Sequence, residues 1–566
     1  MKNHKFIRKT ILAASLLVFL FSASEIKAIS IGETTDFNVE PDYDSSARDR
    51  VTTVLIKTTP KLYFYVEKNW WDSQISTKQS EILSNLDALS LEFTNKIYPT
   101  LTSVFGSEWK PGVDGDERIT IVFHSMKEDA GGYFRTADEY IKIQVPKSNE
   151  REMLYLPVVQ IGDSKLKVLL AHELVHLITF NQKDKVFGVE EEVWLNEARA
   201  DYSSTMLGYD DLYDGSNLQK RVQAFLEKPT DSLTEWQGKK YDYGVASIFT
   251  HYMVSHYSVN ILIDSLKAKS VGIESINYAL QKNGAGENFS QIFTNWTIAT
   301  IINDCSLDRH YCYLDENLKN LKINPTINFL PLAGNSSLSV TNVTKNWSGN
   351  WQKIIGGNGD LKLAFSSLTG LNFKIPYIIY DSNNKYSVGF VKLNENQAGE
   401  VDISKFGTDN KSFIIMPSLQ SKVSDFDGLE FTYPFTFVVS ITGEASLEDQ
   451  AIIKKLLEQI AFLKSEIAKL QGQPTQISCA NLNNNLYAGI NNSSEVKCLQ
   501  EFLKQQGAAI YPEGLVTGNF AALTKSAVIR FQEKYSQDIL QPFGLTSGTG
   551  FVGSSTRAKI NQLLSN

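Results

Sequence analysis

The sequence predicts a multidomain protein with an α+β region of two lobes, a β-sandwich, a short coiled-coil helix and a small all-α domain. Three observations predict this order. Strand and helix patterns share residues 29–325, short β-rich runs between turn residues fill 326–445, and a heptad pattern at 446–474 precedes a helical repeat at 475–566. With 566 residues and 42% hydrophobic content, the chain can build several cores.

The N-terminus predicts export. A positively charged start, with lysine or arginine at positions 2, 5, 8 and 9, precedes an apolar run at 11–21 that is too short to span a bilayer. We expect a signal peptide at 1–28, cleaved after Ala28 or alternatively after Ser24, and a secreted protein with no membrane span after its removal. A retained signal acting as an anchor is the weaker alternative. The net charge of −8 provides no electrostatic basis for binding nucleic acid or an anionic membrane.

The α+β region begins with strands and continues with helices. We expect strands at 51–57 and 62–67 and a helix at 80–97. The pattern from 161 to about 320 is mostly helical, and further helices are expected at 245–258, 259–267 and 291–303.

Two short motifs carry the chemistry. The first is His172-Glu173-Leu174-Val175-His176, and the second, Asn196-Glu197-Ala198-Arg199-Ala200-Asp201, follows it closely. On a helix, positions i and i+4 share one face, so both imidazoles can reach one cation. Catalytic zinc takes three protein ligands, and Glu197 is the expected third.

The motifs contain two further residues with expected roles, Glu173 and Asp201. Glu173 would lie beside a metal-bound water, and Asp201 would accept the free N–H of a ligand histidine and fix its tautomer. The alternative is two core histidines with ordinary partners. The chain has only 7 histidines, and the apolar flanks predict a buried helix, so a metal is the favoured partner.

The motifs resemble those of the gluzincin superfamily, whose thermolysin-type members pair HExxH with NExxD. Thr179 and Gln182 exclude the three-histidine class. Residues 194–197 also look like the WLNE of the aminopeptidase branch, but its Gly-x-Met-Glu-Asn stretch does not occur, which disfavours exopeptidase activity. Residues 111–134 are similar to the edge strand and following loop of hyicolysin-type bacterial endopeptidases.

The resemblance implies a two-lobed, thermolysin-like zinc endopeptidase acting on polypeptides. Glu173 would serve as general base and then general acid. The exposed edge of a strand at 119–123 would pair with the substrate, which would also contact Ala130, Gly131 and Gly132. Tyr241 is the expected second donor to the oxyanion, because its Tyr-x-x-Gly spacing matches the aminopeptidase branch; Tyr243 and His251 are the alternatives.

Two acidic segments and the four cysteines also carry predictions. Asp114-Gly115-Asp116 is either a weak calcium site or a turn before a strand. Glu190-Glu191-Glu192 is expected to be a solvated approach to the second motif. Four cysteines predict two local disulfides, Cys305–Cys312 and Cys479–Cys498, as suits an oxidising exterior.

The regions after 325 carry no catalytic motif. We expect an antiparallel sandwich that includes strands at 375–380, 387–393, 412–416 and 431–442. A helix from Ser446 then presents a heptad seam of about three heptads, which predicts either a short coiled coil joining two or three chains or a rigid helical spacer. The seam residues are Ile453, Leu456, Ile460, Leu463, Ile467 and Leu470.

Residues 475–566 resemble the peptidoglycan-binding module with a three-helix core. The resemblance is carried mainly by Leu499-Gln500, Phe531-Gln532 and an internal echo, in which Gly518-x-Phe520-x-x-x-Thr524 matches Gly550-x-Val552-Gly553-x-x-Thr556. A long connection at 536–549 departs from the pattern and puts the glycan-contacting loop in doubt. The resemblance implies binding to peptidoglycan.

The sequence therefore predicts a secreted, cell-wall-associated zinc endopeptidase. Two alternatives stay open: a hydrolase acting on the stem peptides of peptidoglycan, and a non-catalytic wall-binding or adhesive protein with a vestigial metal site.

Overall fold

The computed structural model describes residues 30–331, 334–426, 428–442, 454–463 and 481–565. The chain forms two compact units, Met1–Gln450 and Ala451–Asn566. The expected signal peptide lies outside the described residues. Within the described part of the chain, no helix is long and apolar enough to cross a membrane.

The first unit begins with a six-stranded mixed sheet. Its strands are β1 (Thr34–Asn38), β2 (Arg50–Thr58), β3 (Leu62–Glu67), β4 (Ile119–His124), β5 (Tyr133–Phe134) and β6 (Met153–Pro157), in the order β1-β2-β3-β4-β6-β5. Strand β4 runs parallel to both of its neighbours, and the other pairs are antiparallel. The strands predicted at 51–57 and 62–67 are thus present as β2 and β3.

The prediction of an exposed substrate-binding edge at 119–123 is wrong. Strand β4 lies between β3 and β6, and all of its residues are buried. The physical reason is that both faces of β4 are covered: Ile121 packs in the core shared with the helices, and Val122 packs in a smaller cluster on the opposite face. The free edge of the sheet on this side belongs to β5.

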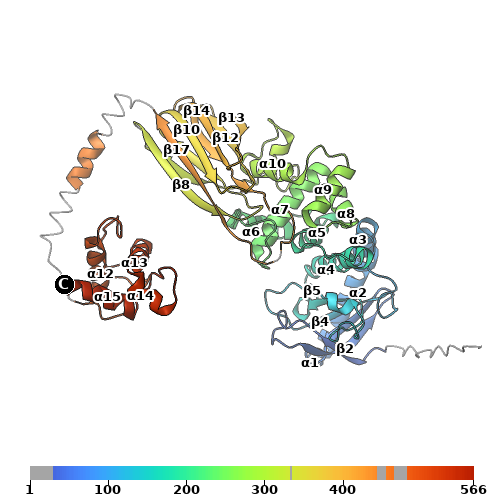
Figure 1. The fold of residues 1–566 in the computed structure, drawn as a ribbon. Helices are drawn as coiled ribbons and strands as arrows, with labels where there is room; N and C mark the ends of the chain where they lie inside the picture. Colours follow the sequence, from blue (N-terminus) through green and yellow to red (C-terminus); the bar gives the residue numbers. More distant parts are fainter. Residues whose placement is uncertain (1–29, 332–333, 427, 443–453, 464–480, 566) are drawn as a thin grey trace, which may run out of the picture. The chain divides into compact units, whose positions relative to one another are not determined.

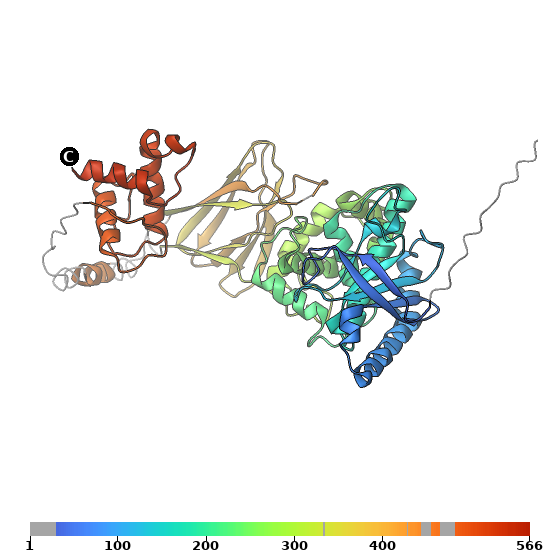
Figure 2. The ribbon, with the colours of Figure 1, turned by 90° about the horizontal axis from the view of Figure 1, so that it is seen from below.

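Helices cover the sheet and make up the rest of the region up to residue 302. They are α1 (Lys68–Asp72), α2 (Ser76–Glu92), α3 (Tyr98–Phe105), α4 (Leu166–Phe180), α5 (Val193–Met206), α6 (Asn217–Glu227), α7 (Lys240–Tyr257), α8 (Asn260–Leu266), α9 (Gly272–Lys282) and α10 (Phe289–Ile302). Figure 1 shows α4 and α5 between the sheet and helices α7 to α9. Seen from below, the sheet lies in front of the helices (Figure 2).

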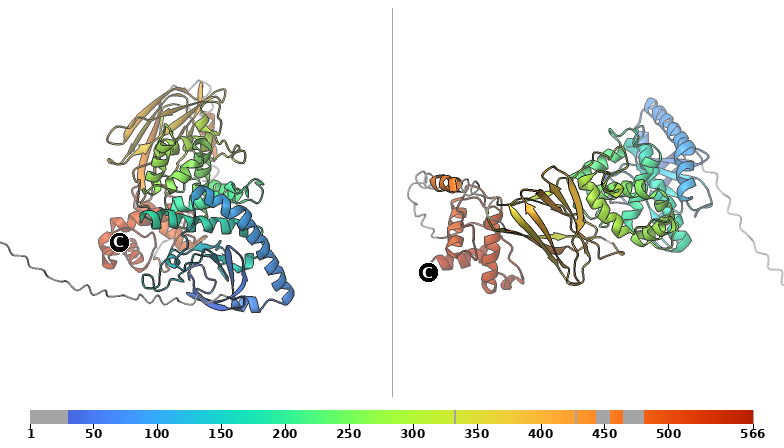
Figure 3. Two further views of the ribbon diagram at one scale, coloured as in Figure 1. Left: turned by 90° about the vertical axis from the view of Figure 1, so that its right-hand side faces the viewer. Right: turned by 90° about the horizontal axis from the view of Figure 1, so that it is seen from above.

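Each predicted helix overlaps a helix of the structure, but the ends of the helices differ from the predicted ends. The helix expected at 80–97 is α2 followed by a π-helical turn, and α3 extends the run to Phe105 as the long blue helix of Figure 3. The helices expected at 245–258, 259–267 and 291–303 are α7, α8 and α10. Helices α6 and α9 were not predicted.

The β-rich region of the first unit contains β7 (Thr326–Leu330), β8 (Ser336–Thr344), β9 (Gln352–Gly356), β10 (Gly359–Ser367), β11 (Phe373–Lys374), β12 (Pro376–Asp381), β13 (Tyr386–Phe390), β14 (Ala398–Phe406), β15 (Asn410–Ile415), β16 (Ser418–Leu419) and β17 (Tyr433–Thr442). All but the small β11–β16 pair belong to one nine-stranded sheet, where two separate sheets were expected. Strands β14 and β15 connect its two parts through the single pair Phe406–Asn410, and the sheet encloses one apolar core.

The β-rich region also shares a core with the helices. Trp347, Trp351 and Met416 belong to the same apolar cluster as the helical residues, and the indole of Trp351 donates a hydrogen bond to the carbonyl oxygen of Thr297 in α10. The predicted boundary at 325/326 therefore lies inside one compact unit. The predicted disulfide Cys305–Cys312 closes a loop just after α10.

The second unit contains a helix at 454–463 and a small helical domain. The helix at 454–463 exposes Leu456, Ile460 and Leu463, whereas the other predicted seam residues lie outside the described residues, so the coiled coil stays a prediction. Cys479 also lies outside them. The domain consists of α12 (Ser494–Gln505), α13 (Ala522–Lys534), the short α14 (Ser536–Ile539) and α15 (Ser554–Leu564), packed around one apolar core.

Candidate metal centre

Helices α4 and α5 bring the three predicted metal ligands together. The Nε2 atoms of His172 and His176 lie 3.1 Å apart, and Oε2 of Glu197 lies 3.2 Å from the first and 3.7 Å from the second. Within the described part of the chain, these three residues are the cluster whose donor atoms could hold a metal ion, all within 4.8 Å of one another. Two imidazole nitrogens and one carboxylate oxygen are the donor set that catalytic zinc prefers, so the residues fit this ion.

Glu173 lies beside this cluster in a buried position. Its Oε2 has no hydrogen-bond partner among the described residues. Burial raises the pKa of its carboxyl to about 7, which the nearby His172 and a hydrogen bond from the backbone of Phe134 oppose. A buried carboxylate with one free oxygen needs a partner, and a bound water would supply one.

The free edge of the N-terminal sheet runs next to Glu173. A β-carbon on Gly132, which directly precedes β5, would lie 3.1 Å from Oε1 of Glu173. The backbone of Gly132 has φ +145°, which a residue with a side chain rarely adopts. The predicted substrate segment Ala130–Gly132 is thus placed against the predicted general base, and β5 takes over the edge position expected for 119–123.

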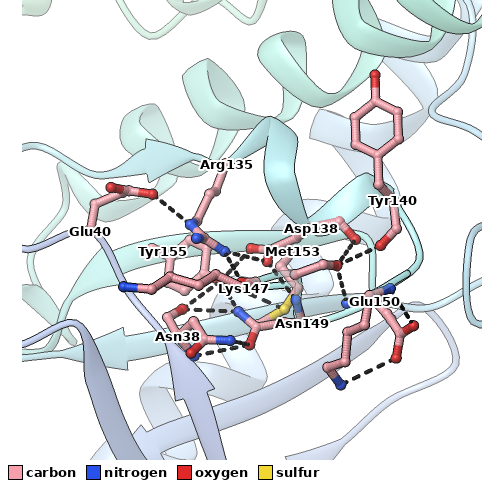
Figure 4. A network of polar contacts seen from close by, with 12 residues as sticks. Asn38, Glu40, Arg135, Asp138, Tyr140, Lys147, Asn149, Glu150, Met153 and Tyr155 are labelled. Carbon is pink, nitrogen blue, oxygen red and sulfur yellow. Dashed lines mark hydrogen bonds and ion pairs between the residues drawn. The ribbon is translucent and has the colours of Figure 1, made fainter. Parts of the chain in front are cut away.

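A buried polar network holds the segment that follows β5 (Figure 4). Asp138 accepts hydrogen bonds from the guanidinium of Arg135 and the hydroxyl of Tyr155 on β6. It also accepts one from the backbone N–H of Asn149, whose side-chain amide donates to the carbonyl oxygen of Asn38 on β1. This network ties the segment after the edge strand to β1 and β6.

Asn196 and Asp201 lie close to the three candidate ligands in the chain and have different hydrogen-bond partners. Nδ1 of His176 lies 3.1 Å from Oδ1 of Asn196, the residue just before the ligand Glu197. The carboxylate of Asp201 accepts hydrogen bonds from the Nε and Nη2 atoms of Arg221 and from the amide of Asn217. Both donors come from α6, whose position could not be derived from the motif, and the role of Asp201 toward a ligand histidine stays a prediction.

The structure places the two candidate tyrosines in different surroundings. The hydroxyl of Tyr241 donates to Glu227 on an exposed surface. Tyr243 is two positions further along α7, which turns it to almost the opposite face of the helix. Burial and then the carboxylate of Glu197 raise its pKa well above its ordinary value, and Arg221 stacks 4.4 Å from the centre of its ring.

Two further residues complete this comparison. His251, the other alternative donor, contacts Asp315 and Thr205 through its two ring nitrogens and is a buried histidine with ordinary partners. Tyr43 was not predicted. Its ring lies 4.6 Å from that of Tyr133 on the edge strand, and burial and the charges of Glu173 and Glu197 raise the pKa of its hydroxyl. Because Tyr43 lies far from both motifs in the chain, no local signal could have identified it.

The loop between the two ligand helices is fixed by buried charges. Glu191, expected to be solvated, is buried and lies 3.1 Å from Nη2 of Arg199 and 3.7 Å from Nζ of Lys183. Lys183 also donates to three backbone carbonyl groups, those of Ser265, Ala268 and Ser270. These contacts set the position of α5 and therefore of Glu197 relative to α4.

The Asp114-Gly115-Asp116 segment favours the turn interpretation over calcium. Oδ1 of Asp114 accepts the backbone N–H of Asp116, as in a side-chain-capped turn. The carboxylate of Asp116 is bonded to Arg118 and to the hydroxyl of Tyr63. The carboxylate at this position is thus already engaged by protein donors.

The C-terminal domain is built from two equivalent halves. In the first half, the buried amide of Gln500 accepts from the backbone N–H groups of Thr517 and Gly518 and donates to Asn519 O and Thr524 Oγ1. In the second half, Gln532 makes the same four hydrogen bonds. Its partners are the N–H groups of Thr549 and Gly550, the carbonyl oxygen of Phe551 and the hydroxyl of Thr556. The predicted sequence echo is therefore a structural repeat.

Comparison with known proteins identifies this domain. Residues 492–560 match the family model of a putative peptidoglycan binding domain, which supports association with the cell wall. No curated protein matches the chain.

Two of the similar solved structures each align with about a fifth of the chain. One is the Yersinia pseudotuberculosis-derived mitogen, with 12% identity over 20% of this chain and 92% of that chain and a TM-score of 0.15. Another is the pre-peptidase C-terminal domain of a Bacillus anthracis collagenase, with 8% identity over 20% of this chain and 96% of that chain and a TM-score of 0.14. No functional conclusion follows from TM-scores this low.

Proposed function

We propose that this chain is a secreted, cell-wall-associated zinc endopeptidase of the gluzincin type. The observation that carries the proposal is the convergence of two histidine nitrogens and one glutamate oxygen, from two helices, beside a buried glutamate. The spacing of these residues in the chain, HExxH followed by NExxD, supports the same class. Residues 492–560 support the location at the wall.

His172, His176 and Glu197 would hold the zinc ion. When bound, zinc supplies Lewis-acid activation of a water molecule and of the scissile carbonyl group. Glu173 would accept a proton from the attacking water and deliver it to the leaving amine. Tyr243 would donate its hydroxyl hydrogen to the oxygen on which negative charge develops, since the carboxylates of Glu197 and Glu173 lie near enough to act on the pKa of its hydroxyl.

The edge strand β5 would align the substrate. Among the described strands, β5 pairs only with β6, so its other side is open to an extended peptide, although the backbone N–H of Phe134 is already donated to Glu173. Gly131 and Gly132 carry no side chain that would obstruct a peptide next to Glu173. Such pairing would hold the middle of a peptide substrate and would not require its free terminus, which favours internal cleavage.

The test combines zinc content with proteolysis. We expect about one zinc per chain in the purified full-length protein and casein cleavage that a chelator abolishes. Glu173→Gln should keep the zinc and lower kcat/KM by roughly 100-fold or more. Glu227→Gln, a change of an exposed glutamate bonded to Tyr241, serves as the matched control and should cleave casein like the parent. A parent protein that binds zinc and cleaves no peptide would overturn the proposal.

Hydrolysis of the stem peptides of peptidoglycan is the second candidate, and the C-terminal domain favours it because this domain would hold the enzyme on that polymer. Purified sacculi and casein distinguish the two substrates. New amino groups released from sacculi, together with intact casein, would select the stem peptides. Binding to sacculi without cleavage of either substrate would instead indicate a non-catalytic wall-binding protein.

A further inference from the structure

The two halves of the C-terminal domain differ at one surface position. Asn519 and Phe551 are equivalent, because their carbonyl oxygens accept the same hydrogen bond from Gln500 and Gln532. The side chain of Asn519 bonds to another residue of the domain: its Oδ1 accepts a hydrogen bond from the backbone N–H of Asn492. The ring of Phe551 faces solvent instead, with 43% of the residue exposed.

Phe551 forms part of an exposed aromatic pair. Its ring stacks on that of Tyr487, with the ring centres 6.2 Å apart and the planes 22° from parallel. Tyr487 is 53% exposed. Two large rings that stay in solvent next to each other lose hydrophobic stabilisation, which a ligand covering them would restore.

The backbone holds this pair in a defined geometry. The neighbouring residues Leu486 and Val552 are buried and exchange two backbone hydrogen bonds of 3.2 and 2.9 Å. A β-carbon on Gly553 would approach the ring of Phe551 to 3.0 Å, so glycine leaves room for the ring. The platform is therefore formed before any ligand arrives, which lowers the entropic cost of binding.

Polar groups lie next to the pair. Asn485, two residues before Tyr487, contacts the guanidinium of Arg557 on α15. Asn485 is exposed and Arg557 is partly buried, and both side chains carry hydrogen-bond donors. An apolar face with polar groups at its border suits a sugar ring, whose C–H face stacks on aromatic rings while its hydroxyl and acetamido groups need polar partners.

We propose that Tyr487 and Phe551 form the surface that binds the glycan strand of peptidoglycan. The inference rests on the wall-binding part of the proposed function and does not depend on catalysis. The family match of residues 492–560 identifies the polymer, and the exposed rings identify its sugar chain as the contacting part. Two rings offer much less area than the roughly 800 Å² per partner of a standard protein–protein interface, which favours a sugar chain over a folded partner.

Cosedimentation of the full-length protein with purified sacculi tests this site. Tyr487→Ala and Phe551→Ala should each weaken binding roughly two- to tenfold, the range expected for one lost aromatic contact. Phe551→Tyr should retain binding because it keeps the aromatic face. Phe543→Ala removes another exposed aromatic residue of the same domain and should bind like the parent. Thermal unfolding of each variant monitors folding.

The possible outcomes distinguish the proposed site at Tyr487 and Phe551 from wall binding in general. Sacculi stripped of stem peptides should still bind the parent, and digestion of the glycan strands should abolish binding. Alanine variants that fold and bind as tightly as the parent would overturn the site and leave wall binding intact. Loss of parent binding after removal of the stem peptides would also overturn it. A parent that binds no sacculi would reject wall binding together with the site.

Discussion

Gly132 and Glu173 lie close together across the boundary between the edge strand and helix α4, because a β-carbon on Gly132 would lie 3.1 Å from Oε1 of Glu173. The same β-carbon would lie 3.0 Å from the backbone oxygen of Tyr155, which cannot easily move. The strand that would receive the substrate and the group that would move the proton are thus positioned by one glycine.

Gly132→Ala should lower casein cleavage roughly tenfold or more while zinc content stays unchanged. The added methyl group must displace the carboxylate of Glu173 or the edge strand, and small displacements in a catalytic site have large effects on rate. Gly131→Ala should cost less, because its new β-carbon meets only the flexible end of Leu169 at 3.3 Å. Steady-state kinetics and metal analysis measure both. Equal losses in the two variants would contradict the contact.

Tyr243→Phe should reduce kcat by roughly 100-fold, as expected when one donor to an oxyanion is removed, with little change in thermal stability. Tyr241→Phe is the matched control and should stay within about twofold of the parent, since its hydroxyl binds the exposed Glu227. Kinetics with one peptide substrate compare the two. If Tyr241→Phe showed the larger loss, the assignment of the donor to Tyr243 would be rejected.

Glu191→Gln should destabilise the first unit by about 3 kcal/mol, because it leaves the buried cations Arg199 and Lys183 without their counter-charge. Glu190→Gln, next to it in the chain but exposed, should change stability by less than about 0.5 kcal/mol. Urea unfolding of both variants measures the difference. A difference within error would show that Glu191 does not balance these cations.

Glu152→Gln should make stability less dependent on pH. Burial raises the pKa of Glu152 to about 7, so between the ordinary value of 4.5 and 7 the folded state keeps a proton that the unfolded state releases. The parent therefore loses stability as pH rises through this window, by an amount on the order of 1–3 kcal/mol. Glutamine can still accept the hydrogen bond from the N–H of Val113.

The control for this prediction is Glu150→Gln. Hydrogen bonds from Lys142 lower the pKa of Glu150, so its charge stabilises the folded state above its ordinary pKa, the opposite sign. Unfolding temperatures at pH 5 and pH 8 compare the parent with both variants. An unchanged difference between the two pH values in Glu152→Gln would disprove the role of this carboxyl.

Local spacing predicted the parts of the site that lie within single helices. His172 and His176 share a face because the helix repeats every 3.6 residues, and Glu197 is in reach because α5 packs on α4. The same argument did not locate the hydrogen-bond partners of Asp201 and Tyr241. Their partners, Arg221 and Glu227, come from α6, a helix that the periodicity did not predict.

The sequence by itself determined the candidate ligand set, the repeated halves of the C-terminal domain and the order of strand-rich and helical regions, because these depend on residue types at short, regular spacing. Only the tertiary structure decided that β4 is interior and β5 is the edge, that Glu191 is buried, and that Tyr43 and Tyr243 lie within reach of the charges of Glu173 and Glu197. Strand order and burial arise from contacts between segments far apart in the chain, and no local pattern specifies them.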